Sequence, residues 1–178
     1  MESLKIILLS ILAAIIYGIL HDQVTARVCV EYFTIGHPPI FNTNSPTLLG
    51  ISWGIVATWW VGALLGVPLA LVAQAGARPK RNARRLVVPI AKLLIVMGLL
   101  AFIAGCTCVI LLHRGIVVIP DYIVKAIPEA ARVPFMADWW AHMMSYLAGF
   151  VGGLVLMVQT WRRRKLENVP PGQGGSAC

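Results

Sequence analysis

The stretch that decides the fold is residues 139–165, which read WWAHMMSYLAGFVGGLVLMVQTWRRRK. A tryptophan pair, Trp139 and Trp140, precedes an apolar segment, and a third tryptophan, Trp161, follows it and leads into four basic residues. At 1.5 Å per helical residue, the distance from Trp140 to Trp161 is about 32 Å, close to the thickness of a bilayer core with its interfaces. Tryptophan is enriched at both membrane interfaces. The stretch therefore predicts a spanning helix at about 139–161, with these tryptophans as interface anchors.

The composition of the whole chain agrees with a membrane protein. Hydrophobic residues make up 58% of its 178 residues and charged residues only 12%, far from the mixture of a soluble domain. Three further apolar segments predict spans at about 4–22, 46–75 and 86–112. The predicted fold class is therefore all-α, a transmembrane four-helix bundle over residues 1–168 with two longer outer loops. The proline- and glycine-rich residues 169–178 predict a disordered tail.

Local signals mark the ends of the first two spans. Ser45 followed by Pro46 is typical of a helix start, with an N-cap and a proline at the first helical position. Pro68 predicts a bend near the inner end of the second span. The first span could instead be a signal peptide cleaved after residues 24–26 (VTA), which would leave three spans. We expect it to be retained, because its apolar run ends several residues before that site.

The second outer loop contains a candidate surface helix. Residues 121–131 lie between prolines and combine charged with apolar side chains. This pattern predicts a short helix on the membrane surface, with Tyr122, Ile123 and Ile127 facing lipid.

The charges are distributed unequally between the two sides of the spans. The side that holds the loop 78–85 carries 11 of the 15 Lys and Arg residues and two of the seven acids, for a net charge of +9. The opposite side carries four basic residues, five acids and all four histidines, for a net charge of −1. Since basic residues in short loops stay in the cytoplasm during insertion, we expect both termini to be cytoplasmic. The basic residues then contact anionic headgroups. Outside the spans the sequence has no face that combines basic and aromatic residues, so it does not indicate nucleic-acid binding.

Small residues recur every four positions along the second span. Residues at this spacing form one ridge on a helix, and small side chains on it let a second backbone approach closely. The sequence therefore predicts a packing seam. Its partner is either another span of this chain or a second molecule, which could be another membrane protein or a second copy of this chain. The seam residues are Gly50, Gly54, Thr58, Gly62 and Gly66.

Groups that could bind a metal lie at the outer ends of the spans. His21 and Asp22 end the first span and His113 ends the third, while Asp138 and His142 are four apart and share one face of the fourth. If the helices bundle, these groups lie at similar depth and could bind a divalent metal. Two of the histidines could instead hold a single haem b from opposite faces. The plainer interpretation, which we favour at this point, is that they are interfacial polar groups that bond to one another and to headgroup water.

Several strings resemble a family of uncharacterised bacterial integral membrane proteins. The strings are residues 21–27 (HDQVTAR), 31–38 (EYFTIGHP), 53–54 (WG), 57–62 (ATWWVG), 138–142 (DWWAH) and 145–146 (SY). The resemblance covers most of the chain except its tail. It implies a multi-pass fold and a location in the bacterial inner membrane, and it implies no activity.

No catalytic residue can be identified from the sequence. No acid or base lies in the middle of a span, where an ion-coupled transporter would place one, and no phosphate-binding loop or nucleophile motif is present. The leading hypothesis is a non-enzymatic protein of the lipid bilayer that acts as an interaction or assembly subunit through its second span. The second is a metal- or haem-binding redox protein with its site at the outer face. The third is a small transporter or channel that works as an oligomer.

Overall fold

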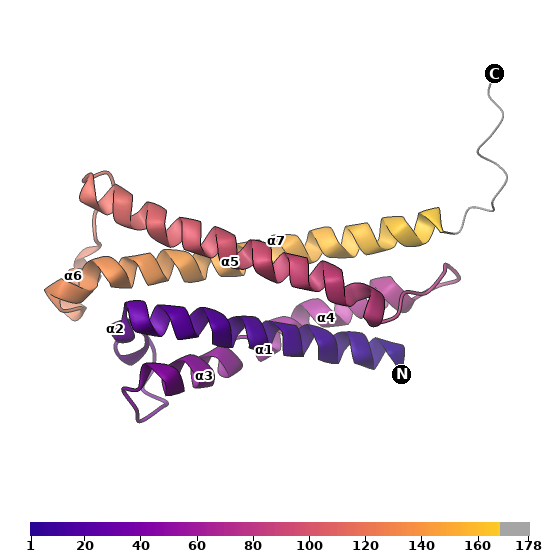
Figure 1. Cartoon of the computed structure of the whole chain (residues 1–178), viewed down its shortest axis with the longest axis horizontal. Helices are drawn as coiled ribbons and strands as arrows, with labels where there is room; N and C mark the ends of the chain where they lie inside the picture. Colours follow the sequence, from indigo (N-terminus) through magenta and orange to yellow (C-terminus); the bar gives the residue numbers. More distant parts are fainter. Residues whose placement is uncertain (168–178) are drawn as a thin grey trace, which may run out of the picture.

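Four long apolar helical segments run side by side in the computed structural model, which describes residues 1–167 (Figure 1). Each of these segments is long and apolar enough to cross a membrane, so the predicted helical bundle of four candidate spans is confirmed. The expected tail at 169–178 lies outside the described residues. The helices are α1 (Glu2–Val28), α2 (Val30–Thr34), α3 (Pro46–Val56), α4 (Trp59–Gln74), α5 (Arg84–His113), α6 (Asp121–Ala126) and α7 (Arg132–Leu166), with a 3-10 helix (Glu129–Ala131) before α7.

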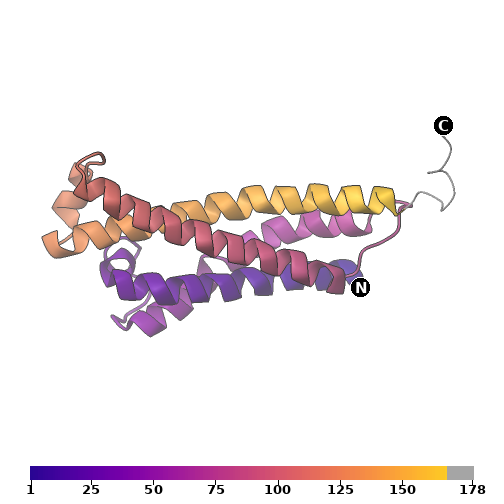
Figure 2. The same cartoon turned by 45° about the horizontal axis from the view of Figure 1, so that its top comes forward.

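The two ends of the bundle differ in their residues. Met1, the loop between α4 and α5, and the last turn of α7 lie together at what we call the basic end. The short helices α2 and α6 lie at the other end, which we call the histidine end because α1 and α7 bring His21 and His142 there (Figures 1 and 2). The first span (α1) packs along the second span (α3 and α4), and the third span (α5) packs along the fourth (α7). We call these two groups the helix pairs, and contacts between them are fewer than contacts within them. The interior between the pairs is therefore less tightly filled than the interior of each pair.

The small-residue seam of the second span packs against α1 of the same chain. A Cβ added at Gly54 would lie 2.5 Å from the backbone nitrogen of Ile19, and one added at Gly62 would lie 2.6 Å from the Cα of Ile11. The two backbones thus approach as closely as glycine permits. Of the two partners that the sequence left open, the structure adopts the intrachain one. The seam is buried between α1 and the second span, so it offers no free surface to a second molecule.

The second span is interrupted at a place that the sequence did not predict. Helix α3 begins as expected, with the Ser45 side chain accepting a bond from the backbone N–H of Leu48, but it ends at Val56 and α4 starts at Trp59. Within the interruption, the Thr58 hydroxyl donates to the carbonyl oxygen of Gly54 at 2.5 Å. Such a bond competes with the helical ladder and often bends helices. Helix α4 continues through Pro68, so the break in the helix lies near the middle of the span, and the bend expected at Pro68 stays a prediction.

Within residues 121–131, two of the three side chains that the sequence predicted on the lipid side pack against protein. They form α6 and the 3-10 helix, but Ile123 and Ile127 are only 2% and 4% exposed and pack in the core with Cys108 and Met136. Of the three side chains that we expected on the lipid side, only Tyr122 is exposed. The expected orientation was wrong because two isoleucines one turn apart fit a buried face as well as a lipid face.

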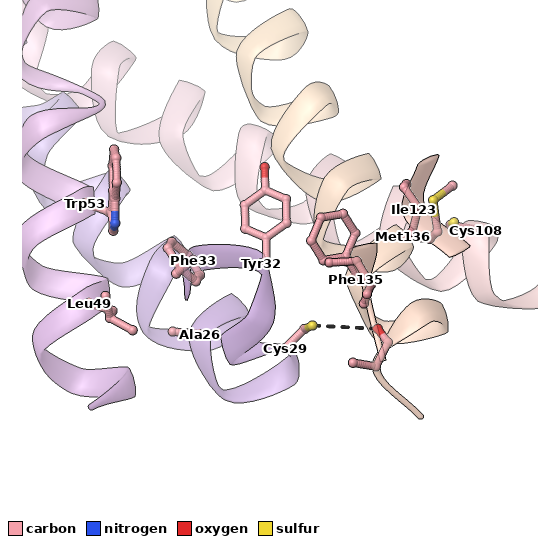
Figure 3. Packing of buried hydrophobic residues seen from close by; sticks show 12 residues of the cluster. Ala26, Cys29, Tyr32, Phe33, Leu49, Trp53, Cys108, Ile123, Phe135 and Met136 are labelled. Atoms are coloured by element: carbon pink, nitrogen blue, oxygen red, sulfur yellow. Dashed lines mark hydrogen bonds between the residues drawn. The ribbon is translucent and has the colours of Figure 1, made fainter. Parts of the chain in front are cut away.

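An aromatic core fills the histidine end (Figure 3). Helix α2 follows α1 directly and turns its Tyr32 and Phe33 inward, between Trp53 of α3 and Phe135 of α7. The rings of Tyr32 and Phe135 lie 5.4 Å apart. This core joins α1 and α3 to α7, and it lies in contact with the candidate site described below.

A buried arginine closes the basic end. Arg164 is 2% exposed, and its guanidinium donates to the carbonyl oxygens of Val72, Ala75 (2.8 Å), Arg78 (3.0 Å) and Pro79 (2.8 Å). The last carbonyls of a helix have no partner within it, and Arg164 supplies one for the end of α4. From the sequence we had read this residue only as part of a basic run that sets orientation.

The three predicted tryptophan anchors differ in exposure. Trp161 at the basic end is 47% exposed, and the Arg78 guanidinium carbon lies 4.8 Å from its ring centroid. Trp139 and Trp140 are partly buried and pack against the aromatic core, because α7 begins two turns before them.

Candidate metal centre

Three potential metal ligands from the first and last spans meet at the histidine end. His21 and Asp22 come from the end of α1, and His142 comes from α7. One ligand atom from each residue lies within 4.8 Å of the others. Nε2 of His142 is 3.2 Å from Oδ1 of Asp22, and the ring centroids of His21 and His142 are 4.5 Å apart. Three ligand atoms at these distances could share one metal ion.

The hydrogen bonds of His142 determine which ring nitrogen faces Asp22. Its Nδ1 lies 2.8 Å from the backbone oxygen of Asp138. A carbonyl oxygen can only accept, so Nδ1 carries a hydrogen and the neutral ring has its lone pair at Nε2. That lone pair faces an oxygen of the Asp22 carboxyl group, itself an acceptor when ionised. The pair is attractive only with a proton or a metal cation between the two atoms.

Two buried polar atoms near this contact have no hydrogen-bond partner among the described residues. They are Nε2 of His21 and Oδ2 of Asp138. The Asp138 residue is 2% exposed and precedes His142 by one helical turn on the same face. Most buried polar atoms are paired, and an unpaired one costs about 1–3 kcal/mol. A cation or an ordered water near the three ligands is the simplest group that would satisfy His21.

Aromatic rings surround the imidazoles and hold them in place. The ring of Tyr32 stacks on His142 with 4.4 Å between centroids, and Tyr17 stacks on His21 at 5.6 Å. The Tyr17 hydroxyl and Ser145 Oγ are 2.6 Å apart and join α1 to α7 one turn closer to the bundle centre. These contacts restrict both rings and keep bulk water away, as a buried metal centre requires.

The remaining histidines differ from what the sequence suggested. His113 is exposed, and its Nδ1 bonds to the Val109 carbonyl of its own helix at 2.7 Å, so the structure does not bring it to the cluster. His37, which we had left in the outer loop without a role, lines the same cavity as His21 and His142. Its ring lies 4.5 Å from that of Trp53, and burial lowers its pKa, so the imidazole is neutral at pH 7.

The signal for His37 was its spacing from α2. It follows Tyr32 by five residues, and its Nδ1 donates to the Tyr32 carbonyl oxygen at 2.8 Å across the turn that ends α2. Helix α2 reverses the direction of the chain directly after α1, so the residues at its end return towards the bundle. The prolines that follow His37 indicate a turn in the sequence, but they do not show this reversal.

Fold and site together define a helical-bundle protein with four candidate membrane spans and a buried histidine and carboxylate cluster at one end. No family model, curated protein or solved structure matches the chain.

Proposed function

We propose that this chain is a multi-pass membrane protein that binds one divalent transition-metal ion between α1 and α7. His21, Asp22 and His142 are the ligands, and the backbone oxygen of Asp138 orients the His142 ring. The observation that carries the proposal is the buried Nε2 lone pair of His142 facing Asp22, which needs a proton or a metal cation between them, beside a His21 Nε2 that has no partner among the described residues. Two imidazoles and one carboxylate suit Zn²⁺ or Fe²⁺ and leave a coordination position for water or a substrate.

The geometry supports a single ion better than a haem. A haem held by two histidines needs the whole macrocycle between their rings. Here the ring centroids of His21 and His142 are 4.5 Å apart, and Tyr32 stacks on His142 with 4.4 Å between the ring centroids. The ring of Tyr32 takes space that a porphyrin would need.

The interaction-subunit hypothesis loses the surface on which it rested. Its contact was the seam of Gly54 and Gly62, and both residues pack against α1. An assembly role would have to use other surfaces, and the transporter hypothesis gains no ionisable group in the middle of a span. The metal site is therefore the stronger basis for a function.

The distribution of charge supports an orientation. With net charges of +9 and −1 on the two sides, the basic end faces the cytoplasm together with both termini. The proposed metal centre then lies near the outer face of the membrane. The family resemblance supports the bacterial inner membrane as the location.

Metal titration of the purified protein in detergent tests the proposal. We expect one Co²⁺ per chain, with visible absorption bands that one equivalent of Zn²⁺ removes. His142→Ala and the shape-conserving Asp22→Asn should each weaken binding by more than the ~10–100-fold typical of losing a group that only orients a ligand.

His113→Ala is the matched control, since His113 is exposed and outside the cluster. It should bind Co²⁺ like the wild type, and circular dichroism should show that all variants remain helical. Binding that survives both His142→Ala and Asp22→Asn would place the ion elsewhere and overturn the proposal.

A further inference from the structure

A cavity of about 120 Å³ lies between the two helix pairs, directly below the histidine cluster. All four spans contribute to its wall. Along α1 it extends from Asp22 to Ser10, which is about 18 Å at the helical rise. Its far end is closed by Leu69, Ile90 and Leu156, which are buried towards the basic end. The cavity is therefore long and narrow and lies parallel to the spans.

The imidazole and carboxyl groups of the cavity wall lie at one end. His21, Asp22 and His142 line the end nearest the outer loops, and the opposite half is lined mostly by aliphatic side chains. Hydroxyl groups also line the wall, and four of them are bonded within the protein. Tyr17 and Ser145 bond to each other at 2.6 Å, Ser10 donates to the Ile6 carbonyl at 2.9 Å, and Thr58 donates to that of Gly54. An occupant thus meets imidazole and carboxyl groups at its head and a mostly apolar wall along the rest of its length.

The cavity wall includes a side chain that is also exposed at the surface of the bundle. Tyr146 lines the cavity and is 41% exposed. We expect a molecule dissolved in the bilayer to enter past this side chain, without crossing the aqueous phase. Ligand sites between helices of a bundle commonly have this mixture of an apolar wall and a few convergent polar groups.

We infer that this cavity binds a single-chain lipid with a neutral, oxygen-bearing headgroup, such as a long-chain alcohol. The chain lies along α1 from Ser10 towards Asp22, and the headgroup oxygen reaches the histidine cluster. A neutral headgroup fits because Asp22 and Asp138 already place two carboxyl groups at this end, which balance at most one divalent cation. The assignment of the headgroup rests on the proposed metal site, whereas that of the chain rests on the cavity alone.

Photolabelling in lipid nanodiscs of phosphatidylcholine tests this inference. The probe is tetradecanol that carries a diazirine in its chain, and mass spectrometry locates the labelled residues. We expect the probe to label cavity residues. Unlabelled tetradecanol should suppress this labelling, and myristic acid, which has the same chain length, should suppress it much less. Myristic acid that competes equally well would overturn the neutral headgroup.

A pair of phenylalanine variants separates the cavity from the lipid surface. Ala13 lines the cavity, whereas its neighbour Leu12 is 56% exposed and does not. Ala13→Phe should fill the part of the cavity about one turn from Ser10 and lower labelling at least tenfold, and Leu12→Phe should leave it unchanged. Equal labelling of both variants, or labelling confined to lipid-facing residues, would overturn the chain-binding site.

Co²⁺ titration of the same nanodiscs keeps the two proposals apart. Ala13→Phe should lose the lipid label and keep its Co²⁺ bands, because Ala13 is about two turns from the cluster. Specific labelling without any Co²⁺ binding would support the chain site and refute the metal site. Normal Co²⁺ binding with labelling that ignores Ala13→Phe would refute the chain site alone.

Discussion

Replacing Gly54 with alanine should destabilise the protein, although alanine is the better helix former. The added Cβ would lie 2.5 Å from the nitrogen and 2.6 Å from the Cα of Ile19, both of them backbone atoms that cannot rotate away. Carbon atoms pack at about 3.5–4.0 Å, so α1 and the second span would have to separate by roughly 1 Å. Overpacking of this kind costs about 1–3 kcal/mol. Alanine returns about 1 kcal/mol through helix propensity, which leaves a net loss of up to about 2 kcal/mol.

Gly98→Ala is the matched control on α5. A Cβ there would meet nothing closer than the Tyr17 ring at 3.9 Å, so only the gain of up to about 1 kcal/mol in helix propensity remains. Reversible unfolding in mixed detergent and SDS micelles, followed by circular dichroism, would measure both free energies of unfolding. We expect Gly54→Ala to be less stable than Gly98→Ala by about 1–3 kcal/mol, the overpacking cost, because the gain in helix propensity is the same in both variants.

Equal stability of the two variants would refute this reasoning. It would mean that Gly54 does not contact α1 in the folded protein, so the seam would again be free for a second molecule. A loss of oligomer in Gly54→Ala at unchanged monomer stability would favour that alternative directly.

Three further predictions follow from the ends of the bundle. Arg164→Met removes the donor for four carbonyl oxygens and should cost about 3–5 kcal/mol in the same unfolding assay, whereas exposed Arg163→Met should change less than about 0.5 kcal/mol. Cys29 is 2% exposed, and burial raises its pKa to about 12, so it stays a thiol at pH 8. A soluble maleimide should therefore label Cys29 far more slowly than the cysteine of Asn42→Cys, and equal rates would show that the aromatic core opens. In intact cells, an impermeant maleimide should label Asn42→Cys and not Ala77→Cys, and the reverse result would invert the proposed orientation.

The spans were predictable because they depend on simple sums along the chain. A run of apolar residues long enough for a bilayer, with Trp161 followed by basic residues, predicts a helix and its end whatever the rest of the fold does. The seam was visible for a similar reason, since a spacing of four marks one ridge of a helix. Its partner was not, because Gly54 and Gly62 carry no information about which backbone they meet.

The candidate site was predictable in depth but not in direction. His21, His113 and His142 all lie towards the same end of the bundle, so their similar depth follows from the sequence. Which of them meet depends on the rotation of each helix about its axis, and α5 turns His113 outward. The interruption at Thr58 was not predicted, because proline disrupts helices more strongly than threonine and the bend was expected at Pro68. Arg164 was missed because a burial of one arginine among three neighbours of like charge leaves no mark in the sequence.

The contact between His142 and Asp22 joins residues 120 positions apart in the chain. Because α1 precedes α7 in the chain, this contact can form only after α7 has been synthesised and has packed against α1. An ion bound there would hold two helices that meet late in folding. Fragments that stop before α7 would keep His21 and Asp22 on α1 with no His142 opposite them, so they should lack the metal affinity proposed for the full bundle.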